Sequence, residues 1–106
     1  MGNKKERPLT LREFERMFPE VWKSYEGLRD ACEREGGLDP KTRELIKIGI
    51  ETSCRRRGGL LAHVHKAKSK GAETKEIFQS ILLALPLIGL PLVLDAFLIV
   101  KKALKD

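Results

Sequence analysis

The stretch from Asp39 to Gly71 constrains the fold more than any other, because it predicts two consecutive helices with a defined start, break and end. Asp39 and Pro40 form a typical helix start, with Asp as N-cap and Pro in the first turn. We place the break at Gly58-Gly59, since glycine inside a helix costs about 1 kcal/mol relative to alanine. Gly71 suits the C-terminal cap of the second helix.

Helical signals also dominate the rest of the chain. Thr10 to Glu13 resembles a capping box, Pro19 suits a first helical turn, and no β-type alternation stands out. We therefore predict an all-α fold of five or six helices, forming one domain over residues 1–106 with a frayed segment at 1–8. The other helices are expected near residues 10–18, 19–35, 77–85 and 92–104.

The helix after Pro19 carries an apolar stripe at helical spacing, which we interpret as core. Cys32 falls within this stripe, so we interpret its thiol as a small buried hydrophobe. The stripe consists of Val21, Tyr25, Leu28 and Cys32, with Trp22 beside it.

Residues 81–100 are nearly all apolar and long enough to span a membrane. Two prolines, a glycine and Asp95 interrupt the run, which favours a helical hairpin buried against the chain, and we expect no membrane partner. This run exposes more apolar surface than one small domain can bury. The helix after Asp39 also has an apolar face that covers more than half of its circumference. Both features predict a homo-oligomer.

Composition and the start of the chain bear on the partners and the cellular compartment that we expect. The net charge of +6 permits an anionic partner, although a solvated, ion-paired surface is the more ordinary explanation. The Lys, Arg and Glu content is thermophile-like. The start of the chain lacks the apolar run of a secretory signal, and Cys32 and Cys54 form no Cys-x-x-Cys pair, so we expect a cytoplasmic protein.

From about Phe18 to Lys101 the chain resembles the carboxymuconolactone decarboxylase family, which includes alkyl hydroperoxidase D-like proteins. The matching segments are Leu38 to Leu45, His63 with Lys66-Ala67, Gly71-Ala72, Glu76-Ile77, and Ala84 to Pro91. The resemblance implies an alkyl hydroperoxidase D-like helical bundle that assembles into dimers, trimers or hexamers. It also carries the family label of peroxiredoxin activity.

The redox branch of that family carries a Glu, then Cys-x-x-Cys, then a His four residues after the second Cys. Aligned on His63, this pattern places the Glu at Glu44 and the cysteines at Arg56 and Gly59. Both thiols are therefore missing, as in the decarboxylase branch. The resemblance implies that Glu44 and His63 are the catalytic pair; periodicity by itself does not choose between His63 and His65.

Three function classes follow. In the first, His63 and Glu44 act as general acid and base in decarboxylation or isomerisation of a small carboxylic acid, whose carboxylate Arg56 binds. In the second, Cys54 acts as a redox thiol in an antioxidant peroxidase, although Arg56 and Gly59 leave it no resolving partner nearby. In the third, a non-catalytic oligomer uses the basic residues Arg55 to Arg57 to bind an anion or nucleic acid.

We expect no metal and no cofactor. His63 and His65 are two residues apart, so they diverge on a helix, and no cysteine–histidine cluster has zinc spacing. Among macromolecular partners we expect other copies of the chain and no nucleic acid, because no aromatic platform or recognition motif accompanies the basic residues.

Overall fold

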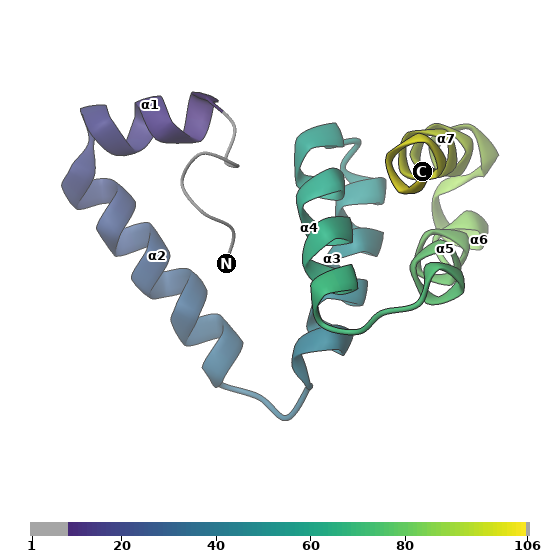
Figure 1. Ribbon diagram of the computed structural model, residues 1–106, viewed down its shortest axis with the longest axis horizontal. Helices are drawn as coiled ribbons and strands as arrows, with labels where there is room; N and C mark the ends of the chain where they lie inside the picture. The colour runs from purple at the N-terminus through teal and green to yellow at the C-terminus, as the bar shows by residue number, and fades with distance from the viewer. Residues whose placement is uncertain (1–8, 106) are drawn as a thin grey trace. The chain divides into compact units, whose positions relative to one another are not determined.

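The computed structural model describes residues 9–105, which contain helices and turns and no strand (Figure 1). Within this range six helices have nine or more residues and one, α6, has four, so the predicted all-α class and helix number are confirmed. The expected fraying of residues 1–8 lies outside the described residues. The elements are α1 (Leu9–Met17), α2 (Pro19–Arg34), α3 (Pro40–Ser53), α4 (Arg57–Ser69), α5 (Thr74–Leu82), α6 (Leu85–Ile88) and α7 (Leu90–Leu104).

The chain divides into two compact units, residues 1–37 and residues 38–106. The described part of the first unit contains α1 and α2, and the second contains α3 to α7. A single domain over residues 1–106 therefore stays a prediction.

In the first unit, Trp22 is the one buried side chain among residues 10–37. Its ring lies 6.2 Å from that of Phe14 and 5.6 Å from that of Tyr25, measured between centroids. The interpretation of the α2 stripe as core was wrong for the single chain, because α1, which packs against α2, does not cover the stripe. The stripe residues Val21, Tyr25, Leu28 and Cys32 are all exposed.

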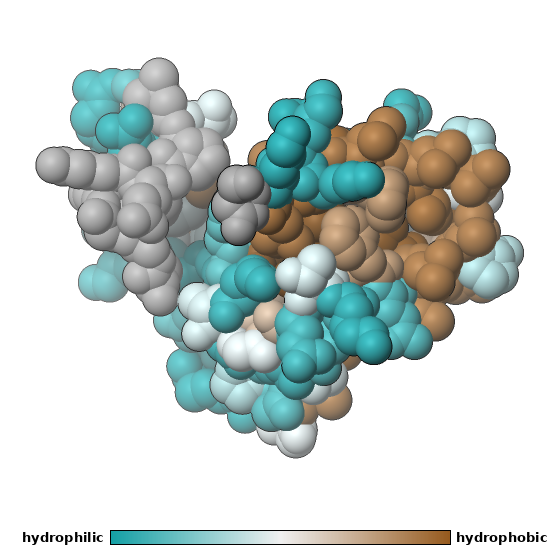
Figure 2. All heavy atoms as spheres, turned by 45° about the vertical axis from the view of Figure 1, so that its right-hand side comes forward, coloured by the Kyte–Doolittle hydropathy of each residue, from teal (hydrophilic) through white to brown (hydrophobic). Residues whose placement is uncertain are grey.

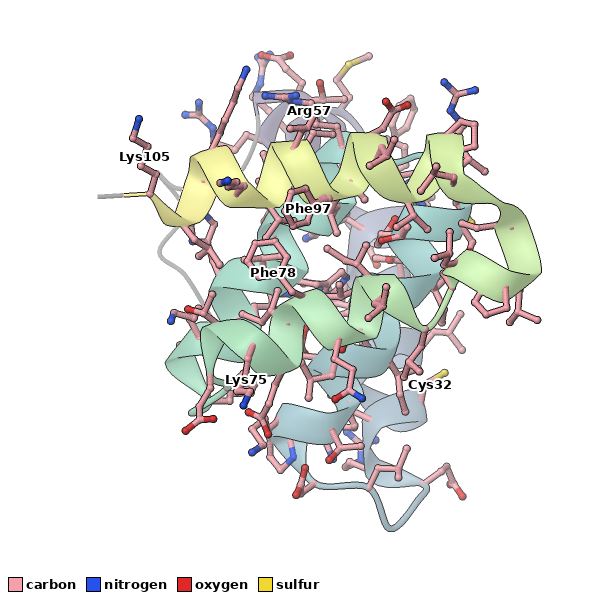
Figure 3. All side chains as sticks on the ribbon, turned by 90° about the vertical axis from the view of Figure 1, so that its right-hand side faces the viewer. Cys32, Arg57, Lys75, Phe78, Phe97 and Lys105 are labelled. Atoms are coloured by element: carbon pink, nitrogen blue, oxygen red, sulfur yellow. The ribbon has the colours of Figure 1, made fainter. Side chains whose placement is uncertain are left out.

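In the second unit, α3 and α4 lie side by side, and α5 and α7 run across them as a second layer (Figure 1). The core lies between these two layers. Phe78 of α5 and Phe97 of α7 face each other at the edge of the core (Figure 3), with ring centroids 5.1 Å apart. The buried apolar residues are Ile48, Leu60, Val64, Ala67, Ala72, Ile77, Ile81, Ala84, Val93, Ala96 and Val100.

Helix α3 begins as the sequence predicts. The Asp39 side chain accepts a hydrogen bond of 2.7 Å from the Thr42 backbone N–H, and Pro40 occupies the first turn. At the other end of the two-helix stretch, Gly71 follows α4 with φ of 93°, in the left-handed region that favours glycine. Both termini of the stretch are therefore confirmed.

The break between α3 and α4 lies earlier than predicted. Helix α3 ends at Ser53 and α4 already begins at Arg57, so Gly58 and Gly59 lie in the first turn of α4. The chain instead turns at Arg55, which adopts a φ of 57°. The prediction of a break at Gly58-Gly59 was wrong, because the first backbone N–H groups of a helix have no intrahelical partner and tolerate glycine there.

The C-terminal segment forms the predicted hairpin, with the short helix α6 between α5 and α7. None of the helices within residues 9–105 has the length and apolar character needed to cross a membrane. Figure 2 shows apolar side chains gathered on the face that these helices form. We use the name C-terminal apolar surface for the exposed large apolar residues of this segment, which are Leu82, Leu83, Leu87, Leu90, Leu94, Phe97 and Leu98.

Candidate functional site

Glu44 and His63 meet between α3 and α4, as the resemblance implies. Nδ1 of His63 lies 2.7 Å from Oε1 of Glu44, and Nζ of Lys47 lies 3.6 Å from Oε2 of the same carboxylate. Although α3 carries polar residues on this side, Glu44 is only 3% exposed because α4 covers it. The pair is therefore a buried carboxylate–imidazole contact and not an exposed surface ion pair.

The electrostatics keep Glu44 ionised. Burial acts to raise the pKa of its carboxyl group, but the hydrogen bond with His63 and the charge of Lys47 outweigh burial, and the pKa lies below its ordinary value. An ionised carboxylate can only accept hydrogen bonds, so Nδ1 of His63 donates to it. This contact holds the ring through Nδ1 and leaves Nε2 for other partners.

The two histidines differ in burial and in contacts. His63 is held against Glu44, with a side chain that is 17% exposed, whereas His65 is exposed. Two residues along a helix correspond to a large rotation about its axis, which turns His65 away from α3.

Glu51 is a site residue that the sequence analysis did not select. Its Oε2 lies 3.6 Å from Nε2 of His63, so the imidazole stands between two carboxylates, Glu44 on one side and Glu51 on the other. Glu44, Lys47 and Glu51 are spaced by three and four residues, which places them on one face of α3. The sequence signal that could have identified Glu51 was this polar stripe together with the glycines in the first turn of α4.

A pocket of about 350 Å³ opens beside Glu51, between the end of α3, the start of α4 and the side of α7. Its apolar wall includes Leu60, Leu92 and Ile99, and its charged residues include Asp95 and three consecutive arginines. The volume lies at the lower end of the range for small-molecule sites, about 300–1,000 Å³.

The arginines at this pocket include Arg56, the predicted substrate-binding residue. Nε of Arg56 lies 3.4 Å from Oε1 of Glu51, and its side chain is 69% exposed. Nη2 of Arg55 lies 3.9 Å from Oδ2 of Asp95 on α7, and both side chains are exposed. Arg56 is thus placed at the mouth of the pocket, where its guanidinium remains open to a ligand.

Cys54, the predicted redox residue, caps the C-terminus of α3 and its thiol is exposed. It does not line the pocket beside Glu51. Within residues 9–105, no three His, Cys, Asp or Glu side chains are grouped so that they could hold a metal ion.

The fold and the site together define a class of protein: an all-helical chain with a carboxylate–imidazole pair between two consecutive helices. A family model for the carboxymuconolactone decarboxylase family matches residues 19–102, and the chain belongs to that family. A search of curated proteins gives no match.

Proposed function

We propose that the protein catalyses proton transfer on a small carboxylic acid, in a decarboxylation or an isomerisation. His63 is the general acid and base, Glu44 fixes its tautomer and stabilises its charged form, and Arg56 binds the carboxylate of the substrate. The single observation that carries this proposal is the buried 2.7 Å contact between Nδ1 of His63 and Glu44. Membership of a decarboxylase family supports the reaction class.

The site geometry favours this function over thiol chemistry. Cys54 lies outside the pocket, and the two positions where the resemblance places redox cysteines hold Arg56 and Gly59. A peroxidase of this type needs a thiolate and a nearby resolving thiol. Proton transfer needs no thiol, only an acid–base group such as His63 and a cation such as Arg56 for the carboxylate.

The function is tested by incubating the protein in D₂O with acetoacetate, levulinate and itaconate, and following deuterium incorporation and CO₂ release by NMR. We expect the wild type to accelerate at least one of these reactions. His63→Ala should lose about a hundredfold to ten-thousandfold in rate, the usual contribution of general acid–base catalysis.

His65→Ala is the matched control for His63→Ala, because this second histidine is exposed on the same helix. It should keep the wild-type rate. A His63→Ala protein that is folded by circular dichroism and still fully active would contradict the proposal.

We also propose that the protein acts as a homo-oligomer. The exposed stripe of α2 and the C-terminal apolar surface support this, as does a groove of about 490 Å³ between α3 and α5–α6. Exposed apolar areas of this kind mark association surfaces. Sedimentation equilibrium should give a mass of two or more times the 12.0 kDa of one chain; a monomer at all concentrations would contradict this proposal.

A further inference from the structure

The pocket and the proposed acid–base pair are not in direct contact. The residues that line the pocket include Glu51 and Arg56, but not His63. Nδ1 of His63 is occupied by Glu44, and its Nε2 lies 3.6 Å from Oε2 of Glu51. Glu51 therefore stands between the imidazole and the space in which a substrate could bind.

Glu51 lines the pocket, and one of its carboxylate oxygens lacks a hydrogen bond. Its side chain is 13% exposed, and its Oε1 is buried and accepts no hydrogen bond from the described residues. Nε of Arg56 lies 3.4 Å from this oxygen and supplies charge without a well-formed hydrogen bond. A buried carboxylate oxygen with spare accepting capacity is costly unless a ligand or water satisfies it.

Gly59 makes room for this carboxylate. A Cβ atom at position 59 would overlap the carboxyl group of Glu51, whereas a Cβ atom at the neighbouring Gly58 would meet nothing within 4 Å. The carboxylate therefore depends on the missing side chain at position 59. This is also the position where the resemblance places the second redox cysteine, so the carboxylate fills space that a thiol would need.

We propose that Glu51 is the catalytic residue that exchanges a proton with the substrate in the pocket between α3, α4 and α7, and that His63 relays this proton. This inference rests on the proposed function and deepens it. Glu44 remains the buried partner that holds the imidazole, while Glu51 is the carboxylate in contact with the substrate. Arg56, beside Glu51, binds the carboxylate of the substrate.

The proton and electron movements balance. In an isomerisation, Glu51 removes a proton from a carbon next to a carbonyl group, and the electron pair of the C–H bond stays on the substrate as an enolate. The proton passes from Oε2 of Glu51 to Nε2 of His63 once these atoms close from 3.6 Å to hydrogen-bonding distance, and Glu44 stabilises the resulting imidazolium. Its return to a different carbon completes the reaction without any change of oxidation state.

In a decarboxylation, the bond between the substrate carbon and its carboxylate breaks, and CO₂ leaves. The electron pair stays on the carbon, which takes one proton from Glu51. His63 replaces that proton on Glu51 and recovers its own from solvent.

The test compares three variants in the D₂O assay with the same three acids. Glu51→Gln keeps the shape of the side chain and removes its basicity, so its rate should fall about a hundredfold or more. Gly59→Ala should also lower the rate, because the new methyl group displaces the Glu51 carboxylate. Gly58→Ala is the matched control: it adds the same methyl group one residue earlier, in open space, and should keep the wild-type rate.

The outcomes separate this inference from the proposed function. If His63→Ala abolishes the reaction but Glu51→Gln leaves it intact, the role of Glu51 is overturned and the proposed function stands. Equal rates for Gly59→Ala and Gly58→Ala would also count against Glu51. A wild type that transforms none of the acids overturns both proposals.

Discussion

Replacing Ile48 by alanine is expected to lower the free energy of unfolding by about 2–5 kcal/mol, the largest effect on stability that we predict. Ile48 is fully buried in the core cluster that also contains Val64, Ile77 and Ile81. Removing three of its carbon atoms loses apolar burial and leaves a cavity between α3 and the helices packed on it. Urea denaturation at a fixed protein concentration measures the loss.

Ile50→Ala is the matched control, since Ile50 lies two residues further along α3 and is 55% exposed. In the isolated chain its replacement should change stability by about 0.5 kcal/mol or less. Equal losses for the two variants would contradict the assignment of the core. A loss for Ile50→Ala that grows with protein concentration would instead place this residue in an interface between copies of the chain.

The stability of the protein should fall in acid, partly through Glu44. The pKa of Glu44 is lower in the folded protein than its ordinary value of 4.5, so the unfolded chain binds the proton more tightly. The stabilising contribution of the ionised carboxylate is therefore complete above about pH 4.5 and is lost as the pH falls through the folded-state pKa. Replacing Glu44 by glutamine removes this contribution.

Urea denaturation of the wild type and of Glu44→Gln, from pH 7 down to pH 3, measures this effect. Both proteins should lose stability in acid, because the pKa of Glu76 is also lowered, by the backbone N–H of Glu73 and by Lys41. The wild type should lose more, so the two curves should converge at low pH. Parallel curves across the whole range would show that Glu44 does not contribute in this way.

The sequence predicted the helices where local chemistry determines them. Asp39 caps α3 and Gly71 follows α4 in a left-handed conformation, because the required side chain and backbone freedom belong to those residues alone. The turn at Arg55 could not be predicted in this way. A non-glycine residue in the left-handed region is held there by its surroundings, and here the helix after it packs back on α3.

The sequence also did not show which residues are buried by helices that lie far away along the chain. The α2 stripe has helical spacing, but periodicity does not show whether another element covers it, and Val21 and Leu28 are exposed. The same limit applied to Glu44, which lies on the polar side of α3 and is nevertheless buried.

At the candidate site, the resemblance selected Glu44 and His63, and the structure brings these two residues together. The polar stripe of α3 was a signal for Glu51 but did not single it out, because an acidic residue near the end of a charged helix is ordinary. Its role as a candidate emerges only from its distance to His63 and from the space above Gly59.

The crowding at Gly59 has an evolutionary consequence. A cysteine at this position would collide with the Glu51 carboxyl group, so sulfur at position 59 and the present rotamer of Glu51 are mutually exclusive. Because this carboxyl group is the far end of a flexible side chain, it would move aside for the sulfur and leave its present positions near His63 and Arg56. The effect of a substitution at Glu51 should therefore depend on which residue occupies position 59, which is epistasis caused by van der Waals volume.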